Sequence, residues 1–528
     1  MGRNRLVTFV VWIMSEEAFV RRASGLVRTL GWWDSFGIGF AQVVLGVGMV
    51  FAYFAIPSTL PHASIPGGLL LLLVVLLPIL IVYTQLAFAM PRSGGDYVYN
   101  SRILHPAIGF MTNWLAVFVV VLNLPMFSDM ITTWPLPSLL TDLGYGQAAS
   151  MFSDLTVRFI MDSILMFIVT LMLIIPLRTY AKIQTVLVLF ALVSPFVMLG
   201  AISIGHDAFV SMWNAVSSVP YDSIINSAKE AGFVTPAVDV TQTAMSAILF
   251  GFYLFTVGPV HIAGELKDIK KSIFGGVLGA VMLSWLIFLI GSIVYMNTLG
   301  FDFANALIFL GAKSPVNPPL LNSIIGFVYH NPMLSAVIDL SLIAGAFVVI
   351  TTSMLIISRW IFAWSFDRIA PAKLAEVHKK YHTPHVTILI LWVVGELLLF
   401  VVLYTGVVGS ILNAALGLAI FFIPGLVSGT VFPYRKKQLF ENSPEFTKKK
   451  IGNIPVITIC GAISTIGMIV ILVVVLANPQ LGFPLTPMSG AFMIGYWFLG
   501  LVIYLIAYAY RKSQGIDIGA AFKEIPPE

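Results

Sequence analysis

Charged residues and cysteine are scarce in this sequence. Only 10% of its 528 residues are Asp, Glu, Lys or Arg, whereas a soluble globular protein carries about a quarter. The single cysteine, Cys460, excludes an internal disulfide framework. Apolar side chains are in excess instead, at 59% of the chain, with a mean hydropathy of +0.96. Many apolar stretches are long enough to cross a bilayer, which indicates a polytopic membrane protein.

Signatures of catalysis are also absent from the sequence. The chain contains no HExxH, GxSxG, P-loop or paired-cysteine metal motif. No repeated filter segment or ring of charges indicates a channel. The net charge of +5 does not indicate a nucleic-acid partner, because lysine and arginine occupy short segments between apolar stretches. We therefore expect no enzymatic activity, no cofactor, no metal site and no nucleic-acid partner.

The apolar stretches and the turn-forming residues between them predict twelve membrane-spanning helices in an all-α fold. Their expected limits are 36–60, 66–90, 103–133, 156–177, 181–204, 240–264, 273–299, 335–363, 384–405, 407–432, 453–477 and 489–511. With a cytoplasmic N-terminus, only Arg158, Lys229 and Lys313 of the 29 basic residues fall on the outer side. Because basic residues are retained on the cytoplasmic side, both termini of this multi-pass protein are expected there, in the plasma membrane.

The spans and the loops between them predict five segments. These are a cytoplasmic N-terminal tail (1–33), a ten-helix core (34–432), a basic cytoplasmic loop (433–452), helices 11 and 12 (453–511) and a cytoplasmic tail (512–528). The apolar run at 6–14 is too short to span a bilayer, and Met14 is an alternative start. Two long outer loops, near 205–239 and 300–334, are expected to carry short helices.

Glycine and proline interrupt two of the predicted spans. The first span contains Gly-Ile-Gly at 37–39 and Gly-Val-Gly at 46–48, and the sixth contains Gly251 followed by Thr-Val-Gly-Pro at 256–259. The two interrupted spans, the first and the sixth, are five spans apart. They therefore occupy corresponding positions of two five-helix halves of opposite orientation. Unwound backbone at this depth exposes amides and carbonyls that a polar ligand can satisfy. This pattern predicts an inverted-repeat transporter. The Gly275-xxx-Gly279 spacing in span seven is instead typical of close helix packing.

The stretch from 83 to 114, YTQLAFAMPRSGGDYVYNSRILHPAIGFMTNW, is the most informative in the chain. An apolar helix ends near Pro91, breaks at Gly94-Gly95 and is followed by a second helix. Arg92 and Arg102 flank the break and place it on the cytoplasmic side. This stretch closely resembles the inner loop between helices 2 and 3 of the amino acid–polyamine–organocation (APC) permeases.

Further segments resemble the same family, in the same order along the chain. They are 34–39 at the entry to helix 1, 251–256 and 264–267 in helix 6 and its exit, and 359–384 after helix 8. The histidines at 378, 382 and 385 have ligand-like spacing, but they lie within or directly after this last segment, which the family match explains. The resemblance covers residues 31 to about 430. It implies a LeuT-like 5+5 inverted repeat with broken helices 1 and 6, secondary active transport by alternating access, and an amino-acid substrate.

The resemblance also implies substrate contacts. Backbone amides would hold the substrate carboxylate at Leu45, Gly46, Val47 and Gly48. Carbonyls would hold its ammonium group at Phe252, Tyr253, Leu254 and Phe255. Tyr253 or Phe255 would close over the substrate as an aromatic gate, although ordinary helix packing also explains these rings. Glu265 would contribute to a cytoplasmic gate with an inner Arg or Lys.

The charges near the broken segments bear on the substrate. Neither segment contains Lys, Arg, Asp or Glu, and His261 is the only titratable side chain near them. An unpaired buried charge is costly, which favours a neutral amino acid. Asp339 could pair with a cationic substrate, but we interpret it as a water-exposed helix end. Arg158 and Asp162, four apart on span four, are expected to pair with each other.

The candidate coupling ions are H⁺ and Na⁺. Symport, exchange and uniport all stay open as modes of transport. Hydroxyls of Thr351, Thr352 and Ser353 are candidates for a sodium site beside helix 1, although such runs also join helices. Glu396 in span nine is a candidate proton relay. The alternatives to an amino-acid permease are a polyamine or organic-cation permease and a non-transporting amino-acid sensor of the same fold.

Overall fold

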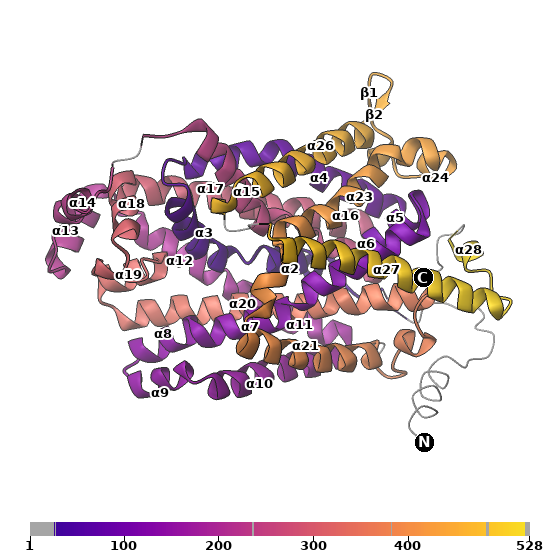
Figure 1. The fold of residues 1–528 in the computed structure, drawn as a ribbon, viewed down its shortest axis with the longest axis horizontal. Coiled ribbons are helices and arrows are strands. Elements are labelled where there is room, and N and C mark those ends of the chain that lie inside the picture. Colours follow the sequence, from indigo (N-terminus) through magenta and orange to yellow (C-terminus); the bar gives the residue numbers. More distant parts are fainter. Residues whose placement is uncertain (1–25, 27, 235–236, 382, 482–484, 523–528) are drawn as a thin grey trace.

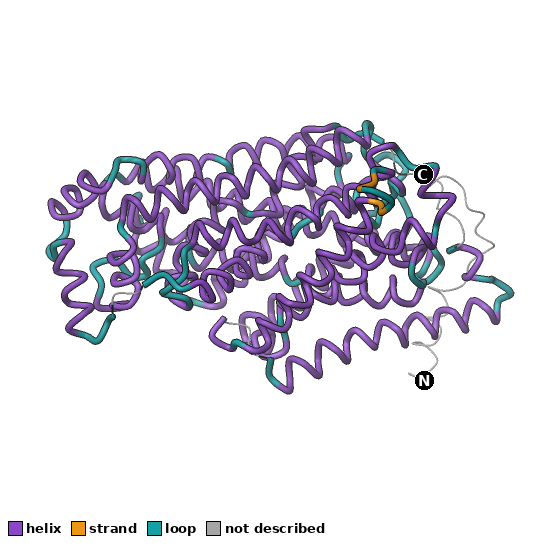
Figure 2. The backbone as a smooth tube through the Cα atoms, turned by 90° about the horizontal axis from the view of Figure 1, so that it is seen from above, coloured by secondary structure: helices purple, strands orange, loops and turns teal. Residues whose placement is uncertain are grey.

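The computed structural model describes residue 26 and residues 28–234, 237–381, 383–481 and 485–522. Met14, most of the expected N-terminal tail and residues 523–528 of the expected C-terminal tail lie outside these residues. The described residues contain twelve helical segments long and apolar enough to span a membrane, as the sequence predicts. The spanning helices run roughly along the long axis of the molecule in both views (Figure 1, Figure 2).

Several spans consist of more than one helix. In chain order the spanning helices are α2 (Trp32–Val43) with α3 (Leu45–Thr59), α4 (Ile65–Ala89), α6 (Pro106–Val121) with α7 (Asn123–Thr133) and α8 (Pro135–Asp142), α10 (Leu155–Ile174), α11 (Leu177–Ala191) with α12 (Val193–Ile202), α15 (Val240–Leu254), α16 (Ile269–Ile273) with α17 (Ala280–Leu299), α20 (Pro332–Phe366), α21 (His385–Thr405), α23 (Ala414–Arg435), α26 (Val456–Ala477) and α27 (Pro487–Ser513). A π-helical segment, Phe274–Gly279, joins α16 to α17.

Short elements gather at the two ends of the bundle. At one end lie α9 (Gly146–Ser150), α13 (His206–Val216), α14 (Tyr221–Glu230), α18 (Phe301–Leu310) and α19 (Leu321–Tyr329) (Figure 1). At the other end lie α5 (Asp96–Ile103), α24 (Lys437–Glu441), α25 (Glu445–Lys448), α28 (Ile518–Ala521) and a hairpin of β1 (Lys450–Ile451) and β2 (Ile454–Pro455). The helix α22 (Val407–Ile411) precedes α23. The prediction of short helices in the two long outer loops is confirmed.

The third and tenth spans differ most from their expected limits. Span three continues past 133 because Pro135 occupies the first position of α8, where a missing amide costs no helical bond. Span ten begins later than 407, at Ala414, because the side chain of Asn413 caps α23 by accepting from the amide of Leu416 at 2.9 Å.

Helix α20 is the centre of the bundle. Of its most apolar window 83% is buried, against 28% for α26 and 22% for α27. The latter two therefore lie at the periphery, and α20 lies where side chains from several spans meet.

Of the two glycines in span seven that were predicted to allow close helix packing, only Gly275 does so. A Cβ on Gly275 would collide with the indole of Trp32, which confirms close packing there. Around Gly279 the nearest atom is the carbonyl oxygen of Phe274 at 3.7 Å, so no neighbouring element packs on it. The closest backbone approach involves Gly276 instead, whose carbonyl carbon would lie 2.9 Å from a Cβ on Gly39 of α2.

The expected pairing of Arg158 with Asp162 is wrong. Arg158 binds Asp129 on α7, and Asp162 accepts a hydrogen bond from Thr132 at 2.9 Å. The i,i+4 spacing brings two side chains to one helix face, but a neighbouring helix supplies better-placed partners for both.

Candidate substrate and ion sites

The first span breaks at Val44. This residue has φ 52° and ψ 43°, the left-handed conformation, which is rare for a β-branched residue. The helix α3 starts at the next residue, and no side chain caps its N-terminus. The amides of the first turn of a helix have no intrahelical partner and lie at the positive end of its dipole. The break therefore creates a position suited to a carboxylate inside the bundle.

The sixth span breaks after Leu254. Residues 255–257 are not helical, and a 3₁₀ turn, Gly258–His261, follows. Thr256 donates a hydrogen bond to the side-chain oxygen of Gln42 on α2. The side-chain amide of Gln42 also lies close to Gly258, and a Cβ on Gly258 would collide with this amide. Gln42 thus joins the interruption of span six to span one.

A cavity of about 270 Å³ lies beside this junction. Its wall comes from α2, α6, α7, the end of α15 with the break that follows it, α20 and α23. Phe252, Tyr253 and Phe255 line it, as expected for substrate-contacting residues, and their roles stay predictions. Leu254 faces away and is fully buried.

The polar groups on the cavity wall carry no permanent charge. They are the side chains of Gln42, Asn123, Thr256, His261 and Ser353, with the Tyr253 hydroxyl and the Trp360 indole N–H. The amide nitrogen of Asn123 donates to the Ser353 hydroxyl at 3.1 Å. No Asp, Glu, Lys or Arg is among the residues that line this cavity in the described part of the chain.

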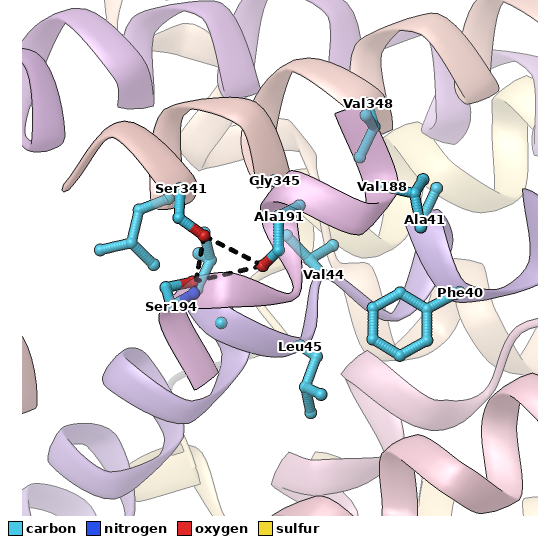
Figure 3. A pocket seen from close by; sticks show the side chains of 13 residues that line it. Phe40, Ala41, Val44, Leu45, Val188, Ala191, Ser194, Ser341, Gly345 and Val348 are labelled. Atoms are coloured by element: carbon cyan, nitrogen blue, oxygen red, sulfur yellow. Dashed lines mark hydrogen bonds between the residues drawn. The ribbon is translucent and has the colours of Figure 1, made fainter. Parts of the chain in front are cut away.

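A second, much smaller cavity of about 10 Å³ lies at the break in span one (Figure 3). Leu45, Gly46 and Val47 line this cavity rather than the large one. Its volume suits about one water-sized particle. Gly48 lines neither cavity, and a Cβ there would lie 2.8 Å from Phe288 and 3.2 Å from Tyr253.

Two serines form the polar side of the small cavity. The Ser341 hydroxyl donates to the carbonyl of Ala191 at 3.2 Å and accepts from the amide of Ser194 at 2.7 Å (Figure 3). Pro195 has no amide to donate to the carbonyl four residues earlier. The hydroxyl of Ser341 compensates for this and holds span five against α20.

The predicted coupling residues have protein partners. Thr351 donates to the amide oxygen of Gln184 at 2.7 Å, and the amide nitrogen of Gln184 donates to Thr352 at 2.8 Å. Glu396 accepts a hydrogen bond from Ser163 at 2.6 Å, on the contact between α10 and α21. Neither threonine nor Glu396 lines either of these two cavities.

Glu265 lies on the opposite side of the break from α15. Its carboxylate accepts two hydrogen bonds from Arg359 on α20, Nε to Oε1 at 2.8 Å and Nη2 to Oε2 at 2.9 Å. Both side chains are 1% exposed. The backbone carbonyl of Glu265 also accepts from the amides of Thr29 and Leu30, each at 3.1 Å. This residue therefore joins span six, span eight and the segment before span one.

His261 and Asp96 form a buried pair that sequence reasoning missed. Nδ1 of His261 lies 3.2 Å from Oδ1 of Asp96 and accepts from the indole nitrogen of Trp360 at 3.1 Å. The amide of Gly94 donates to the carbonyl of His261 at 2.9 Å, which holds the loop against the break. A Cβ on Gly95 would lie 2.5 Å from Nδ1 of His261, so only glycine fits there. The sequence shows the Gly-Gly-Asp run at 94–96. It does not show that Asp96 pairs with His261, 165 residues later.

The loop histidines do not belong to a larger cluster of His, Cys, Asp or Glu in the described residues. No group of three or more His, Cys, Asp or Glu there is placed to hold a metal ion. The rings of His378 and His385 lie 5.3 Å apart, and His382 lies outside the described residues.

The twelve spans of the described residues, two of them broken and joined through Gln42 and Thr256 beside a polar cavity, define a polytopic membrane protein with an internal polar site. Among known protein families, the model of the amino acid permease family matches residues 38–517 of the chain. The chain therefore belongs to the amino acid permease family, within the APC superfamily.

Two relatives are similar to parts of the chain. The glutamate/serine transporter AimA of Bacillus subtilis (strain 168) is 20% identical over 401 residues, which are 74% of this chain and 69% of the relative. The uncharacterized protein 399 of Sulfolobus islandicus rod-shaped virus 1 is 22% identical over 254 residues, 48% of this chain and 52% of the relative. Amino-acid transport across a membrane is the activity that the family defines.

Proposed function

We propose that this protein is a secondary active transporter that moves neutral amino acids by alternating access, with a LeuT-like 5+5 arrangement of its first ten spans. The observation that carries the proposal is the junction of the two broken spans at Gln42 and Thr256, beside a cavity of about 270 Å³. A polar ligand there can form hydrogen bonds with the backbone amides and carbonyls of the breaks. In an unbroken, lipid-facing helix these groups would bond to each other.

The substrate's two charged groups would bind at opposite helix ends. The uncapped N-terminus of α3 suits the carboxylate, through the amides of Leu45, Gly46 and Val47. The C-terminus of α15 presents carbonyls near Phe252 and Phe255 to the ammonium group. The small cavity at the break in span one lies on the carboxylate side.

The cavity wall supports a neutral substrate side chain. It carries no Asp, Glu, Lys or Arg, and an unpaired charge in a dry site is costly. The aromatic rings of Tyr253 and Phe255 would close over the substrate. The bias of basic residues supports cytoplasmic termini in the plasma membrane, with Glu265 and Arg359 closing the cytoplasmic side.

Serine and glutamate form the sharpest test pair, because the bacterial relative is named as a transporter of both. Liposomes containing the purified protein are loaded with unlabelled amino acid, and entry of the labelled amino acid by exchange is measured. We expect serine to enter at least about tenfold faster than glutamate, because no lysine or arginine lines the cavity. Faster glutamate exchange would contradict the neutral-substrate proposal. Flux of polyamines alone, or saturable binding without flux, would support the two alternatives.

For coupling, the pair of His261 and Asp96 supports H⁺ over Na⁺. A buried carboxylate whose two oxygens have no hydrogen bond is an uncompensated charge, which a proton taken up from the substrate side would remove. Tyr83 is a further titratable group near Asp96, and both Asp96 oxygens lack a hydrogen bond. His261 also lines the cavity, so the proton site adjoins the substrate site. Of the three sodium candidates, Thr351 and Thr352 already bond to Gln184, and Ser353 accepts from Asn123.

Replacing Asp96 with Asn removes the carboxylate and keeps the shape. We expect serine accumulation driven by an inward proton gradient to be lost in Asp96→Asn. Glu396→Gln, which changes a carboxylate between α10 and α21, is the matched control and should keep gradient-driven accumulation. Undiminished accumulation in Asp96→Asn, or accumulation that follows a sodium gradient in the unmodified protein, would exclude this pair as the coupling site.

A further inference from the structure

A third cavity, of about 230 Å³, lies at the end of the bundle that carries α13, α14 and α19. The end of α8, the helix α19 and the first turns of α20 enclose it. Its oxygen-bearing side chains are Ser138, Asp142, Asn322, Ser323, Ser335 and Asp339. No Lys, Arg or His is among the described residues that line it.

Asp339 is not the water-exposed helix end that the sequence suggested, because it is 1% exposed. One carboxylate oxygen accepts from the amide nitrogen of Asn322 at 3.2 Å, and the other has no hydrogen-bond partner. The side-chain oxygen of Asn322, which is 6% exposed, has none either. Two acceptor oxygens are thus buried at the cavity wall without a hydrogen bond of normal geometry, an arrangement that is costly unless a ligand satisfies it.

The negative charge of the cavity is a second reason to expect a ligand there. Asp142 and Asp339 interact electrostatically, with Ser335 next to the first carboxyl and Ser138 next to the second. Two carboxylates in one site repel each other unless a cation lies between them or one of them holds a proton. Hydroxyls and amide oxygens add neutral ligands of the kind that hard cations prefer.

We propose that this cavity binds a divalent cation of the calcium class through oxygen ligands from Asp142, Asp339 and Asn322. The volume leaves room for several coordinating waters, since a water occupies about 30 Å³ of liquid. A site with two carboxylates and several waters belongs with weak extracellular calcium modules, with a Kd on the order of 0.1–1 mM.

This site is separate from the substrate cavity. Asp339 and Ser353 are fourteen positions apart on α20, which is about 21 Å along a helix. The ion would join three elements that otherwise meet through few side-chain bonds: α8, α19 and α20. Through α19 it would also hold the contact of that helix with α3, the outer half of the broken first span.

Terbium luminescence tests the proposal without any assumption about transport. Tb³⁺ replaces Ca²⁺ in oxygen sites, and nearby tryptophan excites its emission. Trp213 packs against Phe327, which lines the cavity, with ring centroids 5.1 Å apart. We expect saturable Tb³⁺ emission from the full-length protein in a neutral detergent, displaced by Ca²⁺. Asp142→Asn and Asp339→Asn should each weaken the binding by about tenfold or more.

The controls separate this site from surface charge and from misfolding. Asp207→Asn changes an exposed carboxylate in the first turn of α13 and should leave the emission unchanged. Asp142 is only half-buried, so its variant folds even if Asp339→Asn does not. Unchanged Tb³⁺ affinity in Asp142→Asn, the absence of saturable emission from the unmodified protein, or displacement by putrescine but not by Ca²⁺ would each overturn the proposal.

Discussion

Replacing Arg359 with Met is expected to lower the free energy of unfolding by about 3–5 kcal/mol. Arg359 and Glu265 are each 1% exposed and form two parallel hydrogen bonds, so the single change leaves a buried carboxylate without its partner. Thermal unfolding of the purified protein in detergent measures the loss. The double variant Arg359→Met/Glu265→Leu removes both charges and should recover most of the stability.

The double variant also distinguishes a gate from a purely structural pair. Cys460 is the only cysteine, so a Cys460→Ser background allows one reporter thiol to be placed at Ser353 in the substrate cavity. If the pair closes the cytoplasmic side, this thiol should react faster from that side in the double variant. Restored stability with unchanged reactivity would show that the pair only holds the fold together.

Replacing Ala414 with Trp is expected to reduce amino-acid exchange by about 100-fold or more while the protein still folds. Ala414 is the first residue of α23 and lines the large cavity. An indole there would occupy much of the space for the substrate, and a close-packed interior cannot move aside to restore it. Exchange of labelled serine in liposomes, with the melting temperature in detergent, measures the two effects.

Ala208→Trp is the matched control for this substitution. Ala208 lies on the exposed surface of α13, far along the chain from every element of the cavity wall, so exchange should be unaffected. If Ala414→Trp folds and exchanges serine at the normal rate, the large cavity is not the substrate site.

The features that the sequence predicted are those with local causes. Span positions follow from runs of apolar residues, and the breaks follow from Gly251 and from glycines flanking Val44, because these affect the backbone where they occur. The residue with left-handed φ in span one was not predictable, since Val44 is unfavourable there and only the surrounding packing selects it.

The features that the sequence did not predict depend on contacts between distant segments. Arg158 binds Asp129 on another span rather than its helical neighbour. Asp339 is buried because α19 packs over it. Asp96 meets His261 only because the loop after α4 lies against the break in span six. No periodicity or hydropathy pattern encodes which helices become neighbours.

The most direct test of the account is the reactivity of a thiol at position 353 in liposomes, from each side of the membrane. In the Cys460→Ser/Ser353→Cys protein, a membrane-impermeant thiol reagent is applied outside or inside, with and without serine. We expect modification from both sides, slowed by serine in each case, because alternating access opens one substrate cavity to either side. Modification from one side only, or no protection by serine, would contradict the central claim that this cavity carries the substrate across the membrane.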